Sequence, residues 1–334
     1  MSKKKIIVDT DPGYDDACAI ALAGISDKFE LLGITSVAGN QTIDKVTKNA
    51  LNLASYFNIS APVAKGTSGP LIKPLEVAVV HGKSGLDNIN FEPHNKVIHE
   101  KNAVNFIIDS CLSNEKISII TIGPLTNVAL ALKLCPEIKS HIEVISIMGG
   151  SANMGNVTPA AEFNIYADPE AAHIVLSSGV KIKLNTLDVT LLTTLNDGIM
   201  ERFEKIGTKS SKLFIDINKN YARLLNENFG IKFGSMHDSV AVITLIDESI
   251  VKYKKAKVEV DLSHGCSYGR TNCNFHIKQG IEDSNADTVL ILDNLDNIYV
   301  NIFKRNDFIR NKTNINEIMN DADDLIIFVK IKYQ

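Results

Sequence analysis

The sequence lacks the features that mark membrane-spanning, secreted and nucleic-acid-binding proteins. No apolar run approaches the roughly 20 residues that a helix needs to span a bilayer, and the N-terminus has no apolar signal segment. The net charge is −4, and the one basic run is Lys3-Lys4-Lys5. We therefore expect neither a membrane nor a nucleic acid as a partner.

Cysteine is sparse and tryptophan is absent. The five cysteines are an odd number scattered along a long chain, which is typical of a reduced, intracellular protein, and we expect a cytoplasmic location. One loose pattern of possible zinc ligands exists, but its spacing is unlike the Cys-x-x-Cys of most structural zinc sites. It comprises His264, Cys266, Cys273 and His276.

Buried strands and helices alternate through most of the sequence, which indicates a parallel sheet with both faces covered. A chain of 334 residues could form one large domain or two smaller ones. Without a convincing linker, we expect a single domain over residues 1–334. The predicted fold is α/β and Rossmann-like, with a largely parallel central sheet and helices on both faces. Its expected strands are 6–8, 29–37, 62–65, 117–122, 143–148, 180–186, 258–261 and 288–292, with a further edge pairing near 298–303.

Two segments interrupt this alternation. Residues 66–95 are punctuated by glycine and proline, and a loop of that length in a compact chain is usually functional. We interpret it as a mobile lid. Residues 191–228 show a helical pattern, and we interpret about 191–230 as a helical insertion over the same rim of the sheet.

The first strand ends in an acidic stretch, Asp9-Thr10-Asp11-Pro12-Gly13-Tyr14-Asp15-Asp16. Like charges at a strand-to-helix turn repel one another unless a cation neutralises them. The carboxyl ends of the strands are also where open α/β sheets bind ligands. We therefore predict a divalent metal site with oxygen ligands, which selects Ca²⁺ or Mg²⁺.

Other polar residues follow the later predicted strands and would converge on the same rim. Asn40 or Asp188 alone could be an ordinary loop residue, because asparagine and aspartate favour turns. The full set is Asn40, the turn after Ile122, Asn156, Glu162, Asn164 and Asp188.

The acidic stretch resembles the N-terminal signature of the inosine–uridine nucleoside hydrolases. Further motifs of that family follow in the same order along nearly the whole chain. They are Val37-Ala38-Gly39-Asn40, Gly123-Pro124-Leu125-Thr126-Asn127, Met148-Gly149-Gly150, Gly155-Asn156, Ala161-Glu162-Phe163-Asn164, Ala167-Asp168-Pro169-Glu170-Ala171-Ala172 and His237-Asp238.

The resemblance implies an enzyme that hydrolyses the N-glycosidic bond of ribonucleosides to ribose and free base, for nucleoside salvage. It implies one Ca²⁺ per subunit, held by Asp11, Asp16, Asp238 and the main-chain carbonyl of Ile122. Asp11 would also be the general base, and His237 the general acid for the leaving base. Ribose would be bound by Asp15, Asn156, Glu162 and Asn164, with Asn40 lining the site. The family resemblance also suggests a homodimer or homotetramer.

Base preference follows from finer features of the resemblance. One purine-selective branch stacks the base on tryptophan, which this chain lacks, whereas His81 in the lid resembles the pyrimidine or nonspecific branch. Leu225 and Phe229 stand where pyrimidine-selective relatives often have Gln and Tyr. We expect uridine and cytidine as preferred substrates, with inosine possible, and Phe229 near the base.

Two other functions fit parts of the sequence. A metal-dependent phosphatase could use Asp9-Thr10-Asp11, but it needs a lysine at a later strand end to balance the phosphate. A non-catalytic nucleoside or sugar sensor could keep the ribose ligands while losing Asp11 or His237, and both residues are present.

Overall fold

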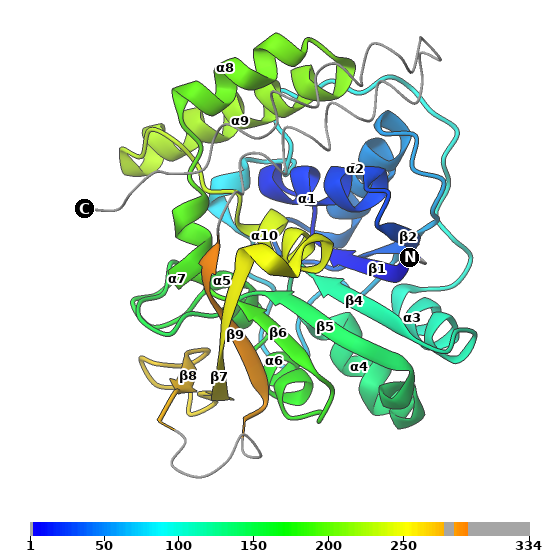
Figure 1. Cartoon of the computed structure of the whole chain (residues 1–334), viewed down its shortest axis with the longest axis vertical. Helices are drawn as coiled ribbons and strands as arrows, with labels where there is room; N and C mark the ends of the chain where they lie inside the picture. Colours follow the sequence, from blue (N-terminus) through cyan, green and yellow to red (C-terminus); the bar gives the residue numbers. More distant parts are fainter. Residues whose placement is uncertain (1–2, 277–283, 293–334) are drawn as a thin grey trace.

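The computed structural model describes residues 3–276 and 284–292 (Figure 1). Nine strands in that part of the chain form one sheet, in the order β3-β2-β1-β4-β5-β6-β9-β7-β8. The strands are β1 (Lys4–Thr10), β2 (Phe29–Ser36), β3 (Val63–Lys65), β4 (Ile117–Thr121), β5 (Ile142–Met148), β6 (Ile182–Asn185), β7 (Val251–Val260), β8 (Thr271–Asn274) and β9 (Ala286–Leu292).

The centre of the sheet is parallel and buried on both faces. β1 pairs in parallel with β2 and β4, and the pairing continues in parallel through β5, β6 and β9. Asp9 lies level with Thr35 on one side and Thr121 on the other. The carboxyl ends of β1, β2 and β4 therefore meet at one rim, as the sequence predicts.

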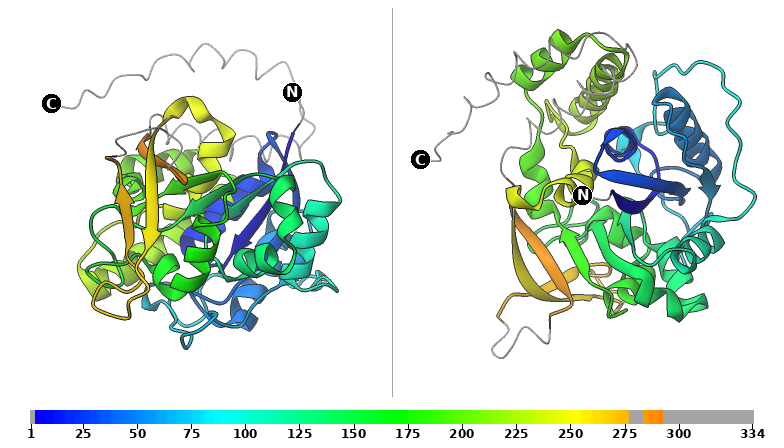
Figure 2. Two further views of the ribbon diagram at one scale, coloured as in Figure 1. Left: turned by 90° about the horizontal axis from the view of Figure 1, so that it is seen from below. Right: turned by 45° about the vertical axis from the view of Figure 1, so that its right-hand side comes forward.

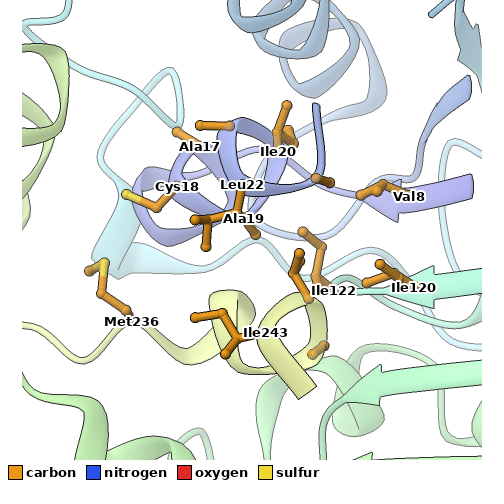
Figure 3. Close-up of a cluster of buried hydrophobic side chains, with 14 of the residues drawn as sticks. Val8, Ala17, Cys18, Ala19, Ile20, Leu22, Ile120, Ile122, Met236 and Ile243 are labelled. Atoms are coloured by element: carbon orange, nitrogen blue, oxygen red, sulfur yellow. The ribbon is translucent and has the colours of Figure 1, made fainter. Parts of the chain in front are cut away.

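Helices cover both faces of the sheet (Figures 1 and 2). One apolar core joins α1 and α10 to β1 and β4, with Val8, Ile20 and Ile243 among its side chains (Figure 3). A second core packs α3, α4 and α6 against the other face. The helices are α1 (Tyr14–Ile25), α2 (Ile43–Tyr56), α3 (Ala103–Leu112), α4 (Thr126–Leu134), α5 (Phe163–Ala167), α6 (Pro169–Leu176), α7 (Leu187–Thr190), α8 (Asp197–Ile206), α9 (Lys209–Phe229) and α10 (His237–Ile246). None in the described ranges has the length and apolar character to cross a bilayer.

The predicted fold class is confirmed, with two differences in detail. β7 spans ten residues and pairs antiparallel with β8 and β9, whereas we expected only 258–261. Adjacent Lys254 and Lys255 are both exposed, so the alternation of buried and exposed residues shifts phase within the strand and obscures its full length. The helical pattern of 191–228 divides at Gly207, which has a φ of +68° and ends α8. The edge pairing near 298–303 lies outside the described residues, and the single domain over 1–334 stays a prediction.

The lid loop packs against α1 and α2. It contains a short 3₁₀ helix, Val79–His81, and two of its backbone carbonyls accept side-chain hydrogen bonds. Gln41 Nε2 donates to Gly82 O at 2.8 Å, and Asn49 Nδ2 donates to Ser84 O at 2.8 Å. These bonds hold the lid down on the body of the protein. Its mobility stays a prediction.

Candidate active site

A cluster of buried carboxylates lies at the carboxyl rim of the sheet. Asp15 and Asp16 stand in the first turn of α1, and Asp238 stands in the first turn of α10, where helix dipoles favour negative charge. Carboxylate oxygens of these three residues lie within 4.8 Å of one another. Asp11 is fully buried in the turn between β1 and α1.

Asn40 links Asp11 to Asp16. Its backbone N–H donates to Asp11 Oδ2 at 2.6 Å, and its side-chain Nδ2 donates to Asp16 Oδ2 at 3.1 Å. Asp16 also accepts from Thr10 Oγ1 at 2.6 Å and from the Gly13 N–H at 2.9 Å. The remaining oxygen, Asp11 Oδ1, is buried without a hydrogen-bond partner.

The cluster is strongly disfavoured electrostatically without a cation. Burial raises the pKa of Asp11 and Asp238 well above the ordinary value, and neighbouring aspartates raise these pKa values further. Burial and the Asp16 charge raise the pKa of Asp15 to about 8. The groups that lower the pKa of Asp11, Asp15 and Asp16 are hydrogen-bond donors rather than cationic side chains. Four buried carboxylates and an orphaned oxygen therefore fit a hard divalent cation.

The main-chain carbonyl of Ile122 lies at the same rim. Ile122 directly follows β4, and its N–H donates to Asp9 O at 2.9 Å. Its carbonyl accepts from Asn164 Nδ2 at 3.3 Å, and the same amide donates to Met148 O at 3.2 Å. Asn164 therefore joins the ends of β4 and β5 beside the acidic cluster.

Asp9 points away from this cluster toward β2 and α4. Its Oδ1 accepts hydrogen bonds from Thr35 Oγ1 and from Asn127 Nδ2, and burial raises its pKa to about 7. Asn127 also donates to Ser36 O at 2.9 Å. Asp9 thus ties three elements together beneath the rim.

Glu162 is held entirely by backbone donors. Its carboxylate accepts from the N–H groups of Asn164 (3.0 Å), Ile165 (3.2 Å) and Gly150 (2.9 Å), so it caps α5 and closes the preceding loop. Burial nevertheless raises its pKa to about 7. The residue is 3% exposed and lies next to Gly149 at the end of β5.

Two histidines from distant segments approach the carboxylates. His81 Nδ1 accepts from the Tyr14 N–H at 3.2 Å, so the proton lies on Nε2, which is 3.9 Å from Asp15 Oδ1. Burial lowers the pKa of His81 to about 3, and the ring is neutral. His237 opens α10 and shares a 2.7 Å hydrogen bond with Thr190 Oγ1. Although His237 is partly exposed, desolvation lowers its pKa to about 4.

Comparison with known proteins shows which family the chain belongs to. The family model for inosine-uridine preferring nucleoside hydrolase matches residues 6–300. This chain belongs to that family. The hydrolase is 42% identical to the pyrimidine-specific ribonucleoside hydrolase RihB of Escherichia coli strain K12 over 275 residues, which are 82% of this chain and 88% of that protein.

Solved structures agree in fold. The purine-preferring ribonucleoside hydrolase from Gardnerella vaginalis is 31% identical, with a TM-score of 0.82 over 91% of this chain and 98% of that one. The plant nucleoside hydrolase PpNRh1 is 28% identical, with a TM-score of 0.83 over 91% and 99%. The protein is therefore a ribonucleoside hydrolase, an enzyme that cleaves the N-glycosidic bond.

Most of the predicted site residues come together in the hydrolase, and two stand apart. Asp11, Asp15, Asp16, Asn40, His81, Glu162, Asn164 and Asp238 are all buried, and they lie at or against the rim. Asn156 is exposed, and its Oδ1 accepts from the Phe163 N–H at 2.9 Å. Phe229, the last residue of α9, is 55% exposed.

Sequence reasoning missed two tyrosines of the hydrolase. Tyr221 of α9 stacks on His81 (centroids 5.7 Å apart, planes at 15°) and on Tyr14 (5.7 Å, 22°). Burial raises the pKa of Tyr221, and the charges of Asp15 and Asp238 raise it further. In the sequence, Tyr221 follows the apolar spacing of α9 and is indistinguishable from a core residue.

The weaker sequence candidates have other roles. Asp188 accepts from the Ala152 N–H at 2.7 Å and thereby anchors the loop after β5. Within residues 3–276 and 284–292, the one cluster able to hold a metal is Asp15, Asp16 and Asp238, so the cysteine–histidine pattern does not assemble.

The phosphatase alternative needs a lysine at the rim, and the buried lysine of β6 does not supply it. This residue, Lys183, pairs with Glu248 at 2.9 Å. Glu248 also pairs with Lys4 at the amino end of β1, so Lys183 cannot balance a phosphate at the opposite rim.

Proposed function

We propose that this hydrolase acts on pyrimidine ribonucleosides, uridine first and cytidine next, with inosine as a slower substrate, and that it uses Ca²⁺. The observation that carries the proposal is the buried cluster of Asp15, Asp16 and Asp238 at the carboxyl rim of the sheet, with the orphaned Oδ1 of buried Asp11 electrostatically coupled to it. The pyrimidine preference rests on the similarity to RihB, on the buried lid histidine His81, and on the absence of tryptophan.

In this proposal, Asp11, Asp16, Asp238 and the carbonyl of Ile122 hold the Ca²⁺. An oxygen of Asp15 lies within 4.8 Å of oxygens of Asp16 and Asp238, so Asp15 borders the same proposed site. Three aspartates and a carbonyl leave room for ribose hydroxyls and water among the six to eight oxygen ligands that Ca²⁺ takes. When bound, the cation supplies positive charge that lowers the pKa of an attacking water and orients the sugar.

Asp11 is the proposed general base. The Asn40 N–H fixes its Oδ2, so its Oδ1 is the oxygen that is free to accept a proton from water. Because both oxygens are buried, the carboxylate has one orientation, and no reorganisation precedes proton transfer. At the end of β1, Thr10 donates to Asp16, and Asp9 ties the strand to β2 and α4 beneath the rim.

The ribose is proposed to lie between Asp15, Glu162, Asn164 and Asn40, with Asn156 reaching it from the loop after β5. Glycosidic cleavage develops positive charge on the sugar in an oxocarbenium-like transition state. Buried carboxylate and amide oxygens stabilise this charge, because they are already oriented and poorly solvated.

The base is proposed to face His81 and His237. Phe229 stands apart in this structure, so its predicted contact with the base requires the end of α9 to move toward the rim. His81 is neutral with its proton on Nε2, so it offers a hydrogen-bond donor to a base carbonyl. His237 is the proposed proton donor to the departing base, which leaves more readily when protonated. Its pKa of about 4 keeps the ring neutral before reaction, so the donation depends on the negative charge that develops on the departing base and raises that pKa. We also propose a cytoplasmic homodimer or homotetramer that serves nucleoside salvage; light scattering after size-exclusion chromatography measures the assembly.

One assay tests the proposed reaction and its competitors. The protein is incubated with uridine, cytidine, inosine and p-nitrophenyl phosphate, with Ca²⁺ or with a chelator, and reducing sugar and phosphate are measured. We expect ribose release, fastest from uridine, that is lost on chelation and restored by Ca²⁺. Phosphate release without ribose would contradict the reaction, and faster release from inosine would contradict the base preference.

A further inference from the structure

The hydrogen bond between Thr190 and His237 joins two parts of the chain that the sequence does not connect. Thr190 Oγ1 lies 2.7 Å from His237 Nδ1. Thr190 is fully buried, whereas the histidine beside it is partly exposed toward the rim. Neither the catalytic aspartates nor the ribose-binding residues contribute this contact.

Thr190 is rigidly placed. It ends α7, its N–H donates to Thr186 O at 3.0 Å, and its carbonyl accepts from Thr193 Oγ1 at 2.6 Å. At the other end of α7, the Leu187 N–H donates to Gly150 O at 2.9 Å, which fastens the turn to the end of β5. The backbone that carries the hydroxyl is therefore held at both ends of α7.

A hydroxyl suits both protonation states of the ring. It donates to Nδ1 when the imidazole is neutral and accepts from Nδ1–H when the imidazole is charged. Because a hydroxyl carries no charge, it fixes the ring without favouring the cation, unlike a carboxylate in the same place. With Nδ1 occupied, Nε2 is the nitrogen left to face a departing base.

We propose that Thr190 is a positioning residue that holds His237 with Nε2 directed at the leaving base. This inference rests on the proposed role of His237 as the proton donor. It predicts that loss of the hydroxyl lowers kcat more for a leaving group that needs a proton than for one that does not. Uracil leaves poorly without protonation, whereas p-nitrophenolate leaves unaided.

The test compares Thr190→Val, which keeps the shape and removes the hydroxyl, with Thr190→Ser, which keeps the hydroxyl. Each is assayed on uridine and on p-nitrophenyl β-D-ribofuranoside. For T190V we expect kcat on uridine to fall about 10- to 100-fold with KM little changed, which is part of the full effect of a general acid. We expect kcat on the nitrophenyl riboside to stay within about twofold, and T190S to recover most of the uridine rate.

The double variant T190V/H237A supplies the control. If Thr190 acts through His237, the double variant is no slower on uridine than H237A alone. Equal losses on both substrates, additive losses in the double variant, or full uridine activity of T190V would each overturn the positioning role. If the wild-type protein cleaves the nitrophenyl riboside but not uridine, the proposed pyrimidine specificity fails, and the same comparison is made on inosine. A wild-type protein that cleaves none of these compounds would overturn both proposals.

Discussion

Without the proposed cation, the buried and mutually repelling carboxylates lower the free energy of unfolding, and the size of this effect depends on pH. Burial and Asp16 raise the pKa of Asp15 to about 8 in the folded protein, from 3.8. A folded carboxyl with a raised pKa binds a proton that the unfolded chain has already lost. The stability that this proton supplies is present at low pH and is lost as the pH rises through 8.

The magnitude follows from that shift. One pKa unit corresponds to about 1.4 kcal/mol, so raising the pH from 6 to 8 lowers the free energy of unfolding of the metal-free protein by about 2 kcal/mol through Asp15 alone. The raised pKa values of Asp11 and Asp238 act in the same direction. With Ca²⁺ bound, the carboxylates stay ionised throughout, and this loss disappears. Stabilisation by Ca²⁺ is therefore expected to grow between pH 6 and 8.

The assay is urea unfolding followed by far-ultraviolet circular dichroism, because the chain has no tryptophan. It is run at pH 6 and pH 8, with Ca²⁺ and with a chelator. Burial also raises the pKa of Asp9 and Glu162 to about 7. Both residues titrate with Ca²⁺ and with the chelator, so their contributions cancel when the stabilities of the two samples are subtracted.

A matched pair of variants assigns the effect. Asp15→Asn removes the titrating group, so about 2 kcal/mol of the pH dependence of the chelated protein should vanish. Asp188→Asn removes a carboxylate that only anchors the loop after β5, and it should leave that dependence unchanged. The reasoning is refuted if stability falls equally with and without Ca²⁺, or if Asp15→Asn keeps the full slope.

Three further outcomes follow from single contacts. Asp11→Ala should lower kcat on uridine by at least about 10³, because it removes the base and a cation ligand together; near-normal kcat with Ca²⁺ still bound would contradict this. Gly13→Ala places a methyl group against His81 Nδ1, well inside van der Waals contact, so the buried ring must move, and we expect a rise of about tenfold in the KM for uridine together with a lower melting temperature. Asp168→Ala leaves three donors from Leu71, Thr126 and Ala171 without their acceptor, and chemical unfolding should show a loss of about 2 to 4 kcal/mol.

The amino-acid sequence alone was sufficient to predict the rim and most of its residues. Short apolar runs predict the central strands, and parallel pairing brings the residues that follow them to one edge. Asp11, Asn40 and Asn164 could therefore be grouped from the order of strands and turns along the chain, although 29 positions separate Asp11 from Asn40. The roles assigned to them stay predictions until the variants are measured.

The contacts made by the helical insertion and by α7 could not be predicted. Tyr221 and Thr190 reach the two histidines only because α9 and α7 pack beside the rim. In the sequence, Tyr221 has the spacing of an ordinary core residue of a helix, and Thr190 is one of several nearby threonines. Neither pattern indicates that the side chain contacts a histidine of the site. β7 was predicted too short for a different reason, since the two adjacent exposed lysines, Lys254 and Lys255, break the alternation that marks a strand.

The acidic stretch that predicts the metal site also contacts the predicted lid. The Pro12-Gly13 turn starts α1, and this places Asp15 and Asp16 in its first turn. In the same turn, Gly13 has no side chain, and the His81 ring lies in the space that a Cβ would fill. The next residue, Tyr14, donates its N–H to Nδ1 of that ring. Because the Tyr14 N–H fixes the proton of His81 on Nε2, a shift of α1 would move the carboxylates and reorient the lid histidine together. Cation binding at the turn and closure of the lid over the base are therefore expected to be coupled, and His81→Ala should weaken the effect of uridine on Ca²⁺ affinity.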